Sequence, residues 1–205
     1  MLLKRNRLWS RLFVVALVSG SSAVVSHLAR DIETTGYSNN EPVAISQLAP
    51  SQTVTSADNQ IQLTIPSNWN DISQERNTGP SGLVVKSASN YVNVSFTSFA
   101  KADVPLSSEL NAQAALSAGM SPYQDANVIE QDVTMTLNGY PAVMHRVEGT
   151  LLGQSMMTLS YAIETPDHYH MAIAITPAAL FELNQPEIDA VLQSFDVVET
   201  AAFAP

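Results

Sequence analysis

The sequence contains no cysteine among its 205 residues. Without thiols the chain cannot form disulfides, a thiolate nucleophile, a cysteine–zinc site or an iron–sulfur cluster, and it cannot carry the acylated cysteine of a lipoprotein. Its folded part must therefore be stabilised by burial alone. A chain of this length with 45% hydrophobic residues can bury one core, so the sequence predicts a single folded domain.

Basic residues are scarce beyond residue 30. Five of the nine basic residues lie within the first thirty positions, whereas all nineteen acidic residues lie at Asp31 or later. From Asp31 onward, four basic minus nineteen acidic residues give a net charge of −15. Because such a surface repels phosphate, the composition argues against sequence-independent binding of the folded part to nucleic acid or anionic lipid.

Motifs that name an enzymatic reaction are missing as well. The sequence has no P-loop, no dinucleotide-binding fingerprint and no His-Glu-x-x-His pair. The stretch GQSMM at 153–157 has the Gly-x-Ser of a hydrolase nucleophile, but it lacks the second glycine and the strand-to-helix setting. A hydrolase is therefore the least supported hypothesis, and the sequence predicts a protein that is not an enzyme, with no catalytic, cofactor-binding or metal-binding residues assigned.

What the sequence does contain begins with an export signal. Within residues 1–30, a basic segment precedes the apolar run LFVVALV at 12–18, and the small residues SGSSA follow at 19–23. Cleavage after Ala23 is favoured because serines and His27 dilute the apolar segment; an uncleaved membrane anchor is the alternative. Both hypotheses predict an extracytoplasmic location: the periplasm, the thylakoid lumen or the medium.

A polar stretch separates this leader from the rest of the chain. Residues 31–57 are rich in Ser, Thr, Asn, Gln and Pro and have no apolar periodicity, which predicts a flexible linker. The folded domain is expected over 58–199, followed by a tail over 200–205.

The expected domain starts with a strand that has one dry side. In IQLTI, residues 61–65, the apolar side chains alternate with polar ones, and Pro66 ends the ladder because it has no N–H to donate. Trp69 follows in a turn-like segment. We expect its ring to fold back over the end of the sheet, and partner docking through an exposed ring is the alternative.

More strands with period-2 alternation follow. Segments 83–86 and 91–99 predict a hairpin, and four strands at 127–137, 142–149, 155–165 and 169–175 predict an antiparallel meander. Asn138-Gly139 is a strong hairpin turn between the first two of the four. In 127–137 the alternation assigns four residues to the dry face: Ile129, Val133, Met135 and Leu137.

Two helices complete the prediction. One spans 105–120, with Pro105 in its first turn and Gly119 closing it. The other starts at Pro186 with Asn184 as its cap, and its apolar stripe consists of Ile188, Val191, Leu192 and Phe195. A short turn near Thr176 and a closing strand DVV at 196–198 are also expected. The predicted fold class is α+β: a central antiparallel sheet of about six strands flanked by helices, an α/β/α sandwich.

The order of these patterns resembles the PsbP-like superfamily. The start ADNQIQLTIPSNW, the strand VNVSF, the hairpin LNGYPA and the final helix ending in SFDVV carry the resemblance, which covers about residues 57–199. That group includes PsbP, DcrB-type bacterial lipoproteins and Mog-type Ran-binding proteins. The resemblance implies a non-catalytic accessory or binding protein with a protein partner at a membrane-associated complex, of the photosystem II type only if the source is photosynthetic.

One alternative is an extracytoplasmic protein that binds a metal or small ligand. His168 and His170 lie at i, i+2 on one face of a predicted strand, and Asp167 is next to them, so these residues could ligate one metal ion. The opposite face is apolar, which predicts that both histidines lie at a solvated edge as ordinary surface residues. His145, between Val143 and Val147, is expected to be a hydrogen-bonded core histidine.

The remaining candidates have structural explanations. Glu130 and Asp132 are expected on the polar face of their strand, and Glu187 and Asp189 in the first turn of the last helix. The glycosylation triplet NVS at 93–95 falls inside a strand. Two adaptable apolar groups, Met156 with Met157 and Met120 with Tyr123, could each contact a partner or fill their own core.

Overall fold

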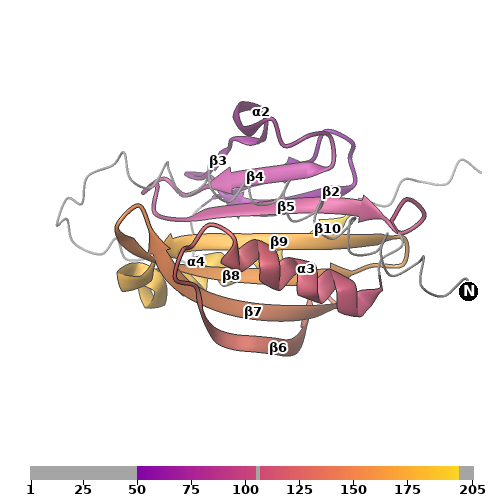
Figure 1. Ribbon diagram of the computed structural model, residues 1–205. Helices are drawn as coiled ribbons and strands as arrows, with labels where there is room; N and C mark the ends of the chain where they lie inside the picture. Colours follow the sequence, from indigo (N-terminus) through magenta and orange to yellow (C-terminus); the bar gives the residue numbers. More distant parts are fainter. Residues whose placement is uncertain (1–49, 105–106, 199–205) are drawn as a thin grey trace, which may run out of the picture.

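Seven antiparallel strands form the central sheet of this protein, seen in the computed structural model, which describes residues 50–104 and 107–198. The spatial order is β3-β4-β5-β9-β8-β7-β6 (Figure 1). The strands are β3 (Asn70–Asp71), β4 (Gly82–Lys86), β5 (Asn93–Ala100), β6 (Asn127–Leu137), β7 (Tyr140–Leu151), β8 (Gln154–Glu164) and β9 (His168–Pro177). The predicted hairpin and the predicted four-strand meander are both confirmed.

A second, three-stranded sheet consists of β1 (Ser51–Thr55), β2 (Ile61–Pro66) and β10 (Asp196–Val197), in the order β1-β2-β10. Strand β2 has the predicted alternation, since Ile61, Leu63 and Ile65 are buried. Strand β1 lies inside the range predicted to be a linker, so the end of that linker at residue 57 was placed too late. The sequence SQTVT has weak alternation, and its pairing with β2 is what holds it in place.

Helices cover both faces of the central sheet. Helix α3 (Ser108–Met120) lies on one face, while the other carries α4 (Phe181–Gln193) and the small sheet (Figure 1). The short elements are α2 (Ser73–Arg76) and η1 (Ala178–Leu180). Buried side chains accordingly form two clusters, one on each face. The predicted α+β sandwich is confirmed, although it has a second sheet and a wider central one than expected.

Strand β6 departs from the predicted alternation. Its pairing with β7 shifts register twice, between Val128 and Glu130 and between Glu130 and Val133. These bulges break the period-2 pattern, so Val133 and Ile129 are exposed by 38% and 42%. Met135 and Leu137, beyond the bulges, do pack against the core as predicted.

The predicted end of the first helix at Met120 is confirmed, but the roles assigned to Gly119 and Asn184 are corrected. Gly119 lies inside α3, which continues to Met120, and an added Cβ there would approach Ser160 Oγ to 2.9 Å. The glycine thus serves close packing rather than termination. Helix α4 starts at Phe181, so Asn184 is a helical residue that donates to Thr176 Oγ1, and Pro186 is inside the helix. The predicted apolar stripe is buried throughout, although Phe195 lies beyond the end of α4 at Gln193.

Trp69 packs inside the protein, as expected. Its side chain is 1% exposed, and its indole Nε1 donates to Glu187 Oε1 at 2.6 Å. Glu187 lies near the middle of α4 and not in a first turn, because the helix starts at Phe181, five residues earlier than predicted. The expected place of Glu187 and Asp189 in the first turn of this helix is therefore wrong.

Several predictions fall on residues 1–49, 105–106 and 199–205, which are outside the described part. They are the leader at 1–30, the linker over 31–49, the role of Pro105 and the tail at 200–205. Among the described residues, no helix has the length and apolar character needed to cross a membrane.

Candidate functional site

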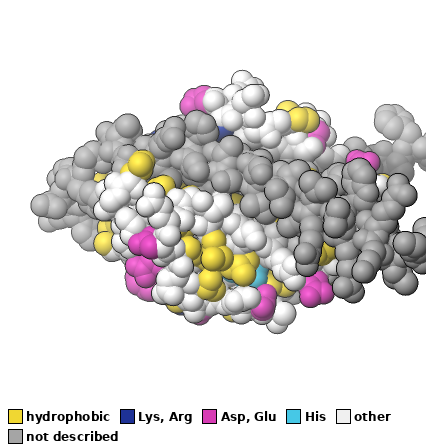
Figure 2. All heavy atoms as spheres, in the orientation of Figure 1, with side chains coloured by type: hydrophobic (Ala, Val, Ile, Leu, Met, Phe, Trp, Pro, Cys, Tyr) yellow, Lys and Arg dark blue, Asp and Glu magenta, His cyan; other side chains and the backbone are white. Residues whose placement is uncertain are grey.

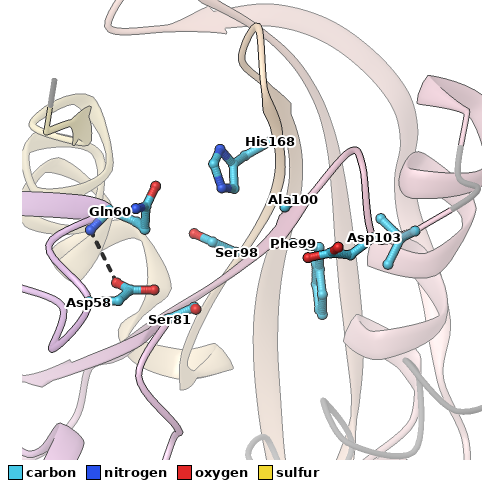
Figure 3. A pocket seen from close by; sticks show the side chains of 9 residues that line it. Asp58, Gln60, Ser81, Ser98, Phe99, Ala100, Asp103 and His168 are labelled. Atoms are coloured by element: carbon cyan, nitrogen blue, oxygen red, sulfur yellow. Dashed lines mark hydrogen bonds between the residues drawn. The ribbon is translucent and has the colours of Figure 1, made fainter. Parts of the chain in front are cut away.

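A cavity of about 300 Å³ opens where the two sheets meet. It is bordered by the turn between β1 and β2, the end of β5 and the start of β9 (Figure 3). Its lining residues are Asp58, Gln60, Ser81, Ser98, Phe99, Ala100, Asp103, Val104 and His168. The volume is at the small end of the range found for ligand sites. We call it the Asp58–Asp103 pocket.

Asp58 is held in place by its own turn. Ser56 Oγ donates to Asp58 Oδ1 at 2.7 Å, and the backbone N–H of Gln60 donates to the same oxygen at 3.1 Å (dashed line in Figure 3). Burial raises the pKa of Asp58, but hydrogen bonds from Ser81, Ser56 and Gln60 outweigh it and leave the pKa below its usual value. The carboxylate is therefore ionised at neutral pH.

Asp103 faces the cavity from the opposite side (Figure 3). Its backbone N–H donates to Ala100 O at 3.0 Å, in the turn that follows β5. None of the described residues donates a hydrogen bond to its carboxylate. His168 and Ser98 lie between the two acids. The pocket thus has a carboxylate on each side and a polar floor.

Among the described residues that line the pocket, none is a lysine or arginine. The nearest basic residue in the sequence, Lys101, is turned to other partners: its Nζ lies 2.7 Å from Glu164 Oε1 and 4.9 Å from the centre of the Tyr169 ring. This ion pair, together with Ser108, lowers the pKa of Glu164. The negative charge of the pocket is consequently left without a cation from its own lining.

His170 lies behind the pocket and is fully buried. Its Nδ1 is 2.7 Å from Ser98 Oγ, and its Nε2 is 3.1 Å from Thr165 Oγ1. Thr165 Oγ1 donates its proton to His168 O, so it can only accept from His170. Nε2 therefore carries the proton, and Nδ1 accepts from Ser98. Burial, with a smaller effect of nearby His168, lowers the pKa of His170 to about 3.

The predicted solvated edge is therefore wrong for His170. Helix α4 and Phe195 cover the face of β9 that carries it, and the Phe195 ring centre is 5.0 Å from that of His170. The sequence showed which residues share a face, but both faces of β9 are covered. His168 is half-buried and is the one histidine of the pair that lines the pocket.

A metal site at 167–170 is not favoured by this geometry. Both nitrogens of His170 are engaged in hydrogen bonds, so neither has a lone pair free for a metal. Asp167 is exposed, and its backbone carbonyl accepts from Lys101 N. Within the described residues, no three His, Cys, Asp or Glu side chains come close enough together to hold a metal ion.

The Ser98–His170 contact brings together a hydroxyl and an imidazole, as in a nucleophile–base pair. Two features weaken such a role. With a pKa of about 3, the His170 imidazole is too weak a base to accept a proton from the Ser98 hydroxyl at neutral pH. The group that orients the imidazole is the hydroxyl of Thr165 and not a carboxylate that would stabilise an imidazolium. The contact is better explained as part of a buried polar cluster in which Ser98, His170 and Thr165 hydrogen-bond to one another.

The other sequence candidates have structural roles away from the pocket. Asn93 of the NVS triplet is fully buried in β5, so it is not accessible for glycosylation in the folded protein. Gly153 lies in the β7–β8 hairpin with φ of 86°, so GQSMM is not a nucleophile turn. Met156 and Tyr123 are buried under α3, while Met157 is half-buried on the other face.

His145 and the acid pair of β6 lie together. His145 is buried and hydrogen-bonded, as predicted, with Nε2 at 3.0 Å from Ala112 O. Glu130 pairs with Arg146 at 3.1 Å. Asp132 lies in the bulge with φ of 55° and its N–H donates to His145 Nδ1. The two acids therefore have separate partners and do not form a shared acid–base site.

The sequence analysis missed Asp58, Asp103 and Ser98. They are at most 45 positions apart along the chain, from Asp58 to Asp103, but belong to different sheets and turns, and no motif joins them. A partial signal existed in Ser-Ala-Asp-Asn at 56–59, because Ser and Asp two residues apart commonly build such a hydrogen-bonded turn. Nothing in the sequence indicated that this turn faces the end of β5.

No known family profile and no curated protein sequence matches the chain. Solved structures do. The Ran-binding protein Mog1p of Saccharomyces cerevisiae superposes with a TM-score of 0.54 at 13% identity, over 76% of this chain and 100% of its own. LpqN of Mycobacterium tuberculosis, involved in cell envelope biogenesis, gives 0.52 at 10% identity, over 74% and 87%. Cyanobacterial PsbP (CyanoP) from Synechocystis sp. PCC 6803 gives 0.50 at 12% identity, over 77% and 98%.

Proposed function

We propose that this protein is an exported, non-catalytic accessory protein that binds a protein partner at a membrane-associated complex. The PsbP/Mog1 fold of the chain supports this proposal. The Asp58–Asp103 pocket is the site that receives a basic side chain of that partner. The observation that carries the proposal is the pocket itself, which has carboxylates on opposite sides and, in the part of the chain that the structure describes, no lysine or arginine in its lining.

The chemistry of the pocket favours an organic cation over other ligands. Its acidic and histidine side chains do not converge on one point as a metal ion requires. A guanidinium or ammonium group carries several N–H donors on one cation, so it can reach carboxylates that are apart from each other. Gln60, Ser81 and His168 supply further polar contacts, and Phe99 and Val104 supply apolar ones for the stem of such a side chain.

The wider surface supports attraction of a basic partner. Figure 2 shows acidic side chains spread over the visible face, while dark blue is confined to one small area. The chain from Asp31 onward carries a net charge of −15. A field of this sign speeds the approach of positively charged segments and repels anionic ones.

Export rests on the sequence of the leader. A basic segment, an apolar run and small residues precede a polar linker, and this order is typical of secretory signals. An uncleaved leader would tether the domain to the membrane, and a cleaved one would release it on the same side. Cell fractionation with mass spectrometry of the N-terminus distinguishes the two, and recovery of the full chain in the cytoplasm would refute export.

Site-specific crosslinking tests the binding proposal, because the chain has no cysteine of its own. Gln60→Cys places a single thiol at the pocket, and Gln113→Cys places one on the exposed side of α3 as the matched control. With a thiol-to-amine crosslinker in intact membranes, we expect one defined protein adduct from the pocket variant. Adducts of equal yield from both positions would contradict the proposal.

Removal of the carboxylate charges from the pocket is a second test of the binding proposal. The double variant Asp58→Asn with Asp103→Asn removes the pocket carboxylates, and Glu109→Gln with Glu182→Gln removes the same charge from exposed helix positions. We expect the pocket variant to lower the yield of the Gln60→Cys adduct by about tenfold, the size of one charge-assisted contact. The control should change it by less than about twofold. Equal yields with both pairs would rule out the pocket as the site.

A further inference from the structure

His145 is a buried imidazole that connects two elements on the α3 side of the sheet. It lies in β7, its side chain is 1% exposed, and each of its nitrogens has a backbone partner. Nε2 lies 3.0 Å from Ala112 O in α3, and Nδ1 accepts from the N–H of Asp132 in β6 at 3.2 Å. One ring therefore joins the covering helix to the edge strand of the sheet.

These contacts fix one protonation state. Because the carbonyl of Ala112 can only accept a hydrogen bond, Nε2 must carry a proton. Because the N–H of Asp132 can only donate, Nδ1 must be unprotonated. The neutral Nε2–H tautomer satisfies both contacts at once. Addition of a second proton would place an N–H on Nδ1 directly opposite the N–H of Asp132, and the two donors cannot bond to each other.

A replacement partner is already close. Asp132 Oδ1 lies 3.9 Å from His145 Nδ1, and the Asp132 side chain is 67% exposed. Asp132 also occupies the β-bulge, with φ of 55° and a register shift between Glu130 and Val133. A bulge is the part of a strand where the ladder is locally interrupted, so a change of contact there does not break regular pairing.

We infer that His145 is a proton-operated latch on the bulge of β6. In its neutral form the ring holds the backbone of Asp132. When the ring gains a proton at Nδ1, that bond breaks, and the Asp132 carboxylate turns in to accept the new N–H. The bulge between Glu130 and Val133 then changes shape, and with it the exposed surface that Ile129 and Val133 form on the edge strand.

The surroundings of His145 leave Asp132 as the charged group that responds. From β6 it is faced by Asp132, from α3 by the carbonyl of Ala112, and from β8 by its register partner Ser160. The buried hydroxyl of Ser160 has no hydrogen-bond partner within the described ranges. Burial lowers the pKa of His145, whereas Ala112 and Asp132 raise it to a smaller extent. Glu130 is engaged with Arg146. This inference goes beyond the proposed function and does not depend on the pocket.

Nuclear magnetic resonance of the histidine rings and backbone amides of the full chain tests the latch. Over a titration from about pH 7.5 to 4, we expect the Nε2–H tautomer at the start and a single titration of His145 with a midpoint below its ordinary value. The Asp132 amide should shift with the same midpoint and lose about tenfold in hydrogen-exchange protection, the size expected for one hydrogen bond. An Asp132 amide that does not follow the His145 titration would overturn the inference.

Two variants separate the latch from general acid effects. Asp132→Asn keeps a residue type that tolerates positive φ but removes the charge, so the His145 midpoint should move to lower pH. Glu130→Gln removes a charge two positions away that faces Arg146, and the midpoint should stay where it is. The inference fails if both variants move the midpoint equally, or if neither does.

Discussion

For individual side chains, burial in the structure decided between the competing interpretations of the sequence. Trp69 and Glu187 are 118 residues apart, yet the indole N–H donates to the carboxylate at 2.6 Å. The sequence could predict a buried Trp69 from its position after a strand end, because the hydrophobic gain of burying an indole is large. It could not predict the acceptor, since nothing local relates the turn after β2 to the middle of α4.

The Trp69–Glu187 bond leads to a prediction about stability. Glu187→Ala leaves a buried N–H without an acceptor, which costs about 1–3 kcal/mol of the free energy of unfolding. Glu187→Gln keeps an oxygen acceptor and should lose less than half of that amount. Urea unfolding followed by circular dichroism measures both variants. Equal losses for Ala and Gln would show that the charge, and not the hydrogen bond, matters.

Secondary-structure elements show where packing overrides local sequence signals. The sequence predicts that Gly119 closes a helix that ends at residue 120; α3 does end at Met120, but Gly119 is still helical and lies where α3 approaches β8. Likewise, the alternation of 127–137 predicts four residues on a dry face, and the bulges of β6 expose two of them. Local patterns identified the elements correctly because their periodicity is intrinsic. They failed where an element meets its neighbour.

The close approach of α3 to β8 leads to a second prediction. Gly119→Ala gains roughly 0.5–1 kcal/mol from reduced freedom of the unfolded chain, but its Cβ would crowd Ser160, and overpacking costs about 1–3 kcal/mol. We expect a net loss in the free energy of unfolding. The double variant with Ser160→Ala should recover most of that loss, because Ser160 Oγ has no hydrogen-bond partner among the described residues. Thermal unfolding of the wild type, Gly119→Ala and the double variant measures these differences in stability.

Gln113→Ala, on the exposed side of α3, is the control for that series. It changes helix propensity slightly without touching the sheet, so its melting temperature should stay close to that of the wild type. If Gly119→Ala is as stable as this control, the helix tolerates a methyl group and the close approach is not what selects glycine.

The whole molecule has two covered sheet faces, and this sets its response to acid. His170 has a pKa of about 3 in the folded protein and an ordinary value of 6.5 in the unfolded chain. As pH falls below 6.5, the unfolded chain binds a proton that the folded protein does not, so the free energy of unfolding decreases. The loss approaches about 1.4 kcal/mol per pH unit and ends near the folded pKa.

Substitution at position 170 isolates this effect. His170→Gln cannot titrate but can still bond to Ser98 or Thr165, so between about pH 6.5 and 4.5 its stability should depend less on pH than that of the wild type. His168→Gln, at the half-buried neighbour, should leave most of the dependence in place. Chemical unfolding at a series of pH values measures the slopes. A wild-type slope matched by His170→Gln would show that other groups dominate.

Taken alone, the amino-acid sequence determined the order of strands and helices, the α+β class, the acidic character and the absence of thiol chemistry, because these follow from local periodicity and composition. Tertiary structure decided that both faces of β9 are covered, where the bulge of β6 lies, and that Asp58 and Asp103 face one cavity. Those features arise when segments far apart in the chain come into contact, and period-2 alternation describes a strand without saying how many of its faces will be covered.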